Sequence, residues 1–140
     1  MPSLIFNSAL LDMANGQIVP ASDQFGVILL RRDYQPDQRD HRTRADVEAF
    51  EVDGGGYRAG GEVADVSVYL DDEDGLVIAL GANRWPRSNI AAGHAAYFKR
   101  NGGEASDDRL LAVIDFGEEI VSRNGAFATS ESLLRIQNNS

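Results

Sequence analysis

The sequence contains no cysteine, only two histidines and a single lysine, Lys99, among its 140 residues. The lack of cysteine excludes disulfides, thiolate catalysis and cysteine-ligated zinc. His41 lies in a polar segment and His94 in a run of small residues, so the H-E-x-x-H metal motif is absent. Two histidines also leave few ways to assemble a dispersed Ser-His-Asp triad. We expect both to be surface residues or satisfied core residues.

Long apolar runs and a basic surface are missing as well. No stretch approaches the ~18 apolar residues that a membrane-spanning helix requires. The first residues lack the basic region and long apolar region of a signal peptide, so we expect synthesis in the cytoplasm. The net charge of −9 argues against general binding to nucleic acid or to an anionic membrane. We therefore expect neither nucleic acid nor membrane as a partner.

Sequence motifs that carry common chemistries are also absent. There is no G-x-S-x-G nucleophile elbow and no G-x-x-x-x-G-K-[ST] phosphate loop, so the triplet 54–56 is expected to form a tight turn. The acidic segment 71–75 is similar to the start of an EF-hand loop. However, the fifth position of that register is Gly75 rather than an acid. We expect no cofactor, no metal site and no enzymatic activity.

What is present predicts one β-rich domain over residues 1–140. Hydrophobic residues make up 43% of the chain and charged residues 25%, as in an ordinary globular domain. Six to eight short strands separated by Gly-, Asn- and Asp-rich turns are expected, and long crossover helices are missing. The predicted fold class is all-β, an antiparallel β-sandwich or jelly-roll-like barrel with a short N-terminal helix.

Local patterns place the elements. A helix of about two turns is expected within residues 6–16, capped by Asn7 or Ser8, with Leu10, Met13 and Ala14 on one face. One or two helical turns are expected within residues 43–50, after a polar connection over residues 31–44. Residues 63–70 alternate as in a half-buried strand, and residues 71–75 close a hairpin. The other expected strands span residues 25–30, 76–80, 91–100, 110–116 and 125–136.

Arginine and tryptophan are the candidate interface residues. Twelve of the thirteen basic residues are arginine, and the single tryptophan lies between two arginines at residues 84–87. Both residue types are enriched where proteins bind one another. Tryptophan at this position could also pack at one end of the core. The predicted interface comprises Arg31, Arg32, Arg39, Arg42, Arg44, Trp85 and Arg87.

Several short motifs can also be read together. Residues 6–18 follow the pattern F-N-S-A-L-x-D-x-A-N-G-x-I. Further motifs follow at Phe25–Leu30, Tyr34–Asp37, His41-Arg42, Asp46-Val47, Gly56–Gly61, Ala95–Lys99, Ile114–Gly117 and Asn124–Phe127. Over nearly its whole length the chain resembles a family of small virion proteins of tailed bacteriophages. It departs from that pattern at residues 130–136, which replace a strand richer in Thr and Gly.

The resemblance implies a non-enzymatic structural protein, located in the virion and in the host cytoplasm during assembly. One placement is a head decoration (cement) protein that binds the major capsid protein, as a homo-oligomer and commonly a trimer. The other placement is a tail or fibre-associated module that binds tail proteins and a host surface glycan. Exposed aromatics at Tyr57, Tyr69 and Trp85 and the acidic hairpin would serve that second role. The resemblance carries no catalytic residues.

Overall fold

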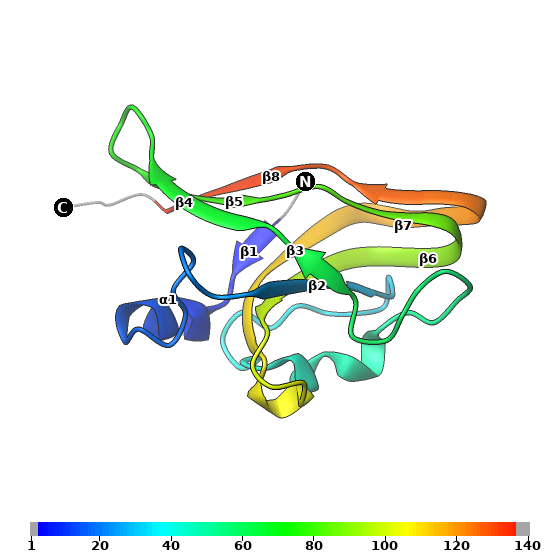
Figure 1. Ribbon diagram of the computed structural model, residues 1–140, viewed down its shortest axis with the longest axis horizontal. Coiled ribbons are helices and arrows are strands. Elements are labelled where there is room, and N and C mark those ends of the chain that lie inside the picture. Colours follow the sequence, from blue (N-terminus) through cyan, green and yellow to red (C-terminus); the bar gives the residue numbers. More distant parts are fainter. Residues whose placement is uncertain (1–2, 137–140) are drawn as a thin grey trace.

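The protein is an all-β sandwich with a short N-terminal helix (Figure 1). The computed structural model describes residues 3–136, so residues 1–2 and 137–140 of the predicted domain lie outside it. Over the described residues the strands are β1 (Ser3–Ile5), β2 (Phe25–Leu30), β3 (Glu62–Ala64), β4 (Val66–Leu70), β5 (Leu76–Leu80), β6 (Asn83–Lys99), β7 (Arg109–Thr129) and β8 (Ser132–Ile136). The helical elements are α1 (Asn7–Ala14) and the 3₁₀ turns η1 (Arg44–Asp46), η2 (Glu48–Phe50) and η3 (Ala105–Asp107).

Two antiparallel sheets form the layers. The five-stranded sheet has the order β1-β7-β6-β2-β3, and the three-stranded sheet has the order β4-β5-β8. The chain passes from one sheet to the other at residue 65, at residues 81–82 and at residues 130–131. The amide of Gly81 donates to the carbonyl of Asp65 at 2.8 Å, which ties two of these corners together. At these three corners a strand of one sheet is followed directly by a strand of the other sheet.

The core lies between the sheets and continues beyond the larger one. All six residues of β2 are buried, and so is the run 92–98 of β6. Figure 1 shows the three-stranded sheet on one side of the five-stranded sheet and the turns η1 and η2 on the other. A strand covered on both faces is typically a continuous apolar run. This explains why residues 25–30 were correctly predicted as a buried strand.

The N-terminal helix is confirmed but its predicted side-chain cap is wrong, and of the three residues expected on one face only Met13 packs against the core. Helix α1 starts at Asn7 with no side-chain cap, and its buried residues are Ala9 and Asp12. Leu10 is exposed, whereas Asp12 accepts a hydrogen bond from Nη1 of Arg109 at 2.9 Å. The ion pair to β7 turns the Asp12 face inward, and the apolar spacing alone gave no sign of it.

Two of the expected strands are shorter than the observed strands that contain them, and a third expected strand is divided between two observed ones. The expected strands 91–100 and 110–116 are parts of β6 and β7, which have 17 and 21 residues. Their pairing continues past irregularities between Trp85 and Ser88 and between Ala92 and His94, which absorb a proline and a glycine. The expected strand 125–136 is divided, because residues 130–131 change sheets.

The predicted half-buried strand 63–70 is also divided. Asp65 separates β3 from β4, and these two strands belong to different sheets. The hairpin at residues 71–75 and the return strand 76–80 are confirmed. However, Val68 and Leu70 are exposed rather than buried. The 3₁₀ turns η1 and η2 confirm the expected helical turns within residues 43–50, and Thr43 and Asp46 form a capping box.

Candidate functional site: an open edge strand and a polar pocket

The exposed arginines of the predicted interface lie on several elements. Arg31 and Arg32 follow β2 and line an open groove of about 570 Å³ together with Asp53 and Glu119. Arg31 is already engaged, since its Nε donates to Asp33 at 3.1 Å. The remaining exposed members, Arg39, Arg42 and Arg87, do not line that groove.

Trp85 lies in the core, one of the two placements that its sequence context left open. Its side chain is 1% exposed, stacks on Tyr57 at 6.3 Å between ring centroids and meets Phe127 edge-on at 6.0 Å. Trp85 sits within β6, opposite Phe127 of β7. In this structure its ring therefore offers no surface to a partner.

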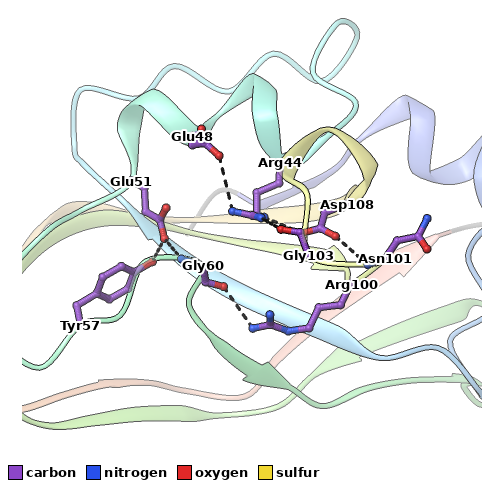
Figure 2. Close-up of polar contacts among 9 residues, drawn as sticks. All are labelled: Arg44, Glu48, Glu51, Tyr57, Gly60, Arg100, Asn101, Gly103 and Asp108. Carbon is purple, nitrogen blue, oxygen red and sulfur yellow. Dashed lines mark hydrogen bonds and ion pairs between the residues drawn. The ribbon is translucent and has the colours of Figure 1, made fainter.

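Arg44 is the second residue of the predicted interface that is buried. Its Nε donates to Oδ2 of Asp108 at 2.8 Å, and both side chains are at most 10% exposed. Oδ1 of Asp108 accepts from the backbone amide of Asn101 at 2.8 Å, so both carboxylate oxygens are used (Figure 2). Glu48 lies one helical turn beyond Arg44, with a carboxylate oxygen 3.9 Å from Nη1. This cluster fastens η1 to the loop before β7.

Arg100 lies in the same polar pocket, which has a volume of about 460 Å³. Its Nη2 donates to the carbonyl of Gly60 at 3.3 Å, and its Nε is buried without a hydrogen-bond partner. The guanidinium groups of Arg44 and Arg100 lie 5.3 and 5.5 Å from the centre of the Phe98 ring. A Cβ at Gly26 would lie 2.9 Å from Nε of Arg100, so glycine leaves the room that this side chain occupies.

A tyrosine holds Glu51, which lines the pocket. The hydroxyl of Tyr57 donates to Oε2 of Glu51 at 2.6 Å and accepts from the amide of Leu29 at 3.1 Å. The same carboxylate oxygen accepts from the amide of Gly60 at 2.9 Å. Burial, together with the hydrogen bond to Glu51, raises the pKa of Tyr57 above its ordinary value of 10. The hydroxyl therefore stays protonated, as its role as a donor requires.

The pocket holds polar groups that are already committed to one another. The carboxylates of Asp108 and Glu51 each accept two hydrogen bonds, one on each oxygen of Asp108 and both on Oε2 of Glu51. The side chains of this pocket have a structural role: they join η1, the segment 51–60 and the loop 100–108 to the five-stranded sheet (Figure 2). Buried polar groups paired in this way favour one arrangement of the backbone, although Nε of Arg100 remains without a hydrogen-bond partner.

Both histidines contact a single tyrosine. The ring of Tyr34 stacks on His41 at 5.6 Å between centroids and meets His94 edge-on at 5.2 Å. Nδ1 of His41 lies 2.8 Å from the Tyr34 hydroxyl and accepts from the amide of Asp37 at 3.3 Å. Nδ1 of His94 lies 3.2 Å from the carbonyl of Arg31. These contacts hold the polar connection 31–41 against β6.

The feature left open is strand β4. It is an outer strand of the three-stranded sheet, and its side chains at Val68, Tyr69 and Leu70 are exposed. Leu70 is 64% exposed although it lies on the same sheet face as Ile78 and Leu134, which are buried. Figure 1 shows the β4–β5 hairpin standing out from the body at this end. The inner face of the small sheet therefore extends past the core that it covers.

Acidic residues stand at both ends of β4. Asp65 precedes the strand, and the turn Asp71–Gly75 carries four acids in a row. Arg135 of β8 pairs with Asp71 and lies 3.6 Å from Glu73. The hydrogen bond from Arg135 lowers the pKa of Asp71 to about 2. Asp71 also caps the turn, since its Oδ1 accepts from the amides of Glu73 and Gly75 at 2.9 Å.

The sequence proposed a set of arginines as an interface, which stays a prediction, and it did not identify the open face of β4. Residues 66–70 showed alternation, which indicates a strand but not how far its sheet extends beyond the core. Within residues 3–136 no group of three or more His, Cys, Asp or Glu side chains is placed to hold a metal ion. In the same span, the helices are too short and polar to cross a membrane. The chain matches no protein-family model, no curated protein and no solved structure.

Proposed function

We propose that the chain is a structural protein of a bacteriophage particle that decorates the capsid by binding the lattice of major capsid protein. The observation that carries this proposal is the open apolar strip of β4, formed by Val68 and Leu70 on the inner face of the small sheet, with Tyr69 exposed on its outer face. Contiguous exposed apolar surface with a polar rim is typical of protein-binding sites. The motif resemblance to small phage virion proteins supplies the biological setting.

Binding would stabilise the capsid through linkage. A protein that binds the assembled shell, and not the free capsid protein, shifts the assembly equilibrium toward the shell. Burial of the β4 strip would supply the apolar contribution. Exposed arginines elsewhere on the surface, such as Arg39, Arg42 and Arg87, would add ion pairs to neighbouring subunits, which favour one docking orientation more than they add affinity. A homo-oligomer, such as a trimer, would multiply these contacts at a symmetry axis.

The tail or fibre alternative has less support from the geometry. Its proposed glycan site needs exposed aromatic rings, because sugars stack on such rings. Trp85 is buried, and Tyr57 is partly buried with its hydroxyl bonded to Glu51. Of the three aromatics considered for this role, Tyr69 alone is exposed. Decoration is therefore the proposal we carry forward.

The test is reconstitution. Purified protein is added to capsids assembled without it, and the particles are imaged by electron cryomicroscopy. We expect density at regular lattice positions, and weaker occupancy for the double variant Val68→Ser and Leu70→Ser. The matched control is Leu11→Ser, which changes a leucine that is 58% exposed on α1, outside the strip. Wild-type protein that leaves the lattice empty contradicts the proposal, and density confined to tails would establish the alternative.

A further inference from the structure

We infer that the free edge of β4 takes up an extended apolar strand of another protein, with lysine or arginine on both sides of that strand. This inference rests on the proposed function, because it names the segment of the partner that docks. Three properties of β4 lead to it: an unpaired backbone edge, an uncovered apolar face and acidic residues at both ends.

The edge is suited to strand addition. Among residues 3–136, β4 pairs with β5 alone, in an unbroken register from Val66 opposite Leu80 to Leu70 opposite Leu76. Natural edge strands are usually protected by a charge, a proline or a bulge. The five residues of β4, read VSVYL, carry none of these. Its outward backbone groups are therefore free to pair with an added strand.

Other sheet edges are shorter or protected. At β3, which is the edge of the five-stranded sheet, Nδ2 of Asn83 donates to the carbonyl of Val63 at 2.8 Å. β1 at the opposite edge has three residues. β8 carries Arg135, which pairs with Asp71. Of the edges in residues 3–136, β4 is the one that combines length, regular register and an uncharged sequence.

The side chains define what the added strand must carry on its inner side. Val66, Val68 and Leu70 lie on the face that continues into Ile78 and Leu134 of the core. Val68 is 37% exposed and Leu70 64% exposed, so this face is left partly uncovered toward the hairpin. A neighbouring strand places its alternate side chains on the same face. Apolar residues at every second position of the partner would cover it.

Charge decides between a second copy and another protein. If two copies paired antiparallel about Val68, Asp65 of one would lie opposite Asp71 of the other, with Asp72 close by. Like charges opposite each other across a ladder are destabilising. Two molecules that each carry a net charge of −9 would also repel at long range. A strand with basic residues at both ends meets the same acids favourably, so any homo-oligomer would use another surface.

The probe is a synthetic nonapeptide with alternating Val and Thr at the five central positions and two lysines at each end. We expect saturable binding to the full chain by fluorescence anisotropy, weakened by salt. Hydrogen exchange of the amides of residues 66–70 should slow on binding. A peptide of the same core with glutamates at its ends is the charge control, and a version N-methylated at alternate residues is the backbone control. We expect neither control to bind.

Protein variants locate the site. Val68→Lys places a charge in the middle of the edge and should abolish peptide binding. Val63→Lys is the matched control, because Val63 is 68% exposed on the edge strand β3 of the other sheet. The double variant Asp65→Asn and Asp72→Asn should weaken binding about fivefold, because two exposed ion pairs are lost. It leaves Asp71, which caps the hairpin turn, unchanged.

The outcomes are distinct. Equal binding of the lysine and glutamate peptides, or binding that Val68→Lys does not affect, overturns the inference. So does a concentration-dependent dimer that protects residues 66–70 without peptide, since the occupant would then be a second copy. If wild-type protein and Val68→Lys decorate capsids equally, the edge inference fails and the proposed function stands. If the peptide binds but capsids stay bare, the proposed function fails and the edge remains a strand-binding site.

Discussion

Strands β2 and β4 are both short, uncharged and rich in large apolar residues, yet their environments are opposite. β2 reads FGVILL and is buried at every position, whereas β4 reads VSVYL and is exposed at four of its five positions. β2 lies between β6 and β3 in the larger sheet, and β4 lies at the margin of the smaller one. The difference teaches that place in the sheet order, more than local composition, decides which apolar strand joins the core and which one remains open.

The largest expected effect comes from truncating one leucine in each strand. Leu29 is 0% exposed and Leu70 is 64% exposed. Leu29→Ala should lower the free energy of unfolding by about 4 kcal/mol, because it leaves a cavity in a close-packed core. Leu70→Ala should change it by about 0.5 kcal/mol or less, as is usual for surface substitutions. Urea denaturation of both variants checks this, and similar losses would contradict the burial difference.

A second comparison uses one chemical pair in two settings. Arg44 and Asp108 form a buried Arg–Asp pair beside the larger sheet, and Arg135 and Asp71 form an exposed one on the smaller sheet. Asp108→Ala should cost about 3 kcal/mol of stability, because it leaves the Arg44 charge buried without its partner. Replacing Arg44 and Asp108 together by Met and Leu should cost less than Asp108→Ala alone. A double variant that is less stable than Asp108→Ala would contradict this reading.

The sequence predicted those features of the two strands that depend on neighbouring residues in the chain. The apolar run 25–30 indicated a buried strand, and the acidic turn 71–75 indicated a hairpin, because each signal lies within a few residues. The exposure of Val68 depends on how far β5 and β8 extend beyond the core, which no local pattern reports. The bracing role of Arg44 depends on Asp108, 64 residues away in the chain. Long-range pairing of this kind is why two predicted interface residues, Arg44 and Trp85, lie inside the protein.

Tyr57 provides a prediction of intermediate size at alkaline pH. The pKa values of Tyr34, Tyr57 and Tyr97 are raised in the folded protein, chiefly by burial. The unfolded chain therefore loses these protons first, so stability is retained below pH 10 and falls as the pH rises above it. Tyr57→Phe should cost about 1–2 kcal/mol at neutral pH, because Glu51 and the amide of Leu29 each lose a partner.

Unfolding at alkaline pH tests whether the raised pKa of Tyr57 contributes to the pH dependence of stability. Unfolding curves of wild type and Tyr57→Phe are recorded at neutral pH and above pH 10. For each protein, the loss of unfolding free energy between the two pH values is then compared. One of the groups responsible is missing in the variant, so its stability should fall less steeply with pH. Parallel curves would show that Tyr57 ionises as readily when folded as when unfolded, against the buried position described above.

The smallest effect is expected at the exposed pair, where acid should remove it. The pKa of Asp71 is about 2 in the folded protein, against an ordinary value of 3.8, because Arg135 donates to its carboxylate. A lowered pKa stabilises the folded state above pH 3.8, and this contribution is lost as the pH falls toward 2. Asp71→Asn removes the charge but keeps an oxygen to accept from the amides of Glu73 and Gly75. Wild type should therefore be slightly more stable than the variant at neutral pH, and the two should converge near pH 2. Denaturation at both pH values checks this: a difference that persists in acid would show that the turn, and not the ion pair with Arg135, is what the carboxylate supports.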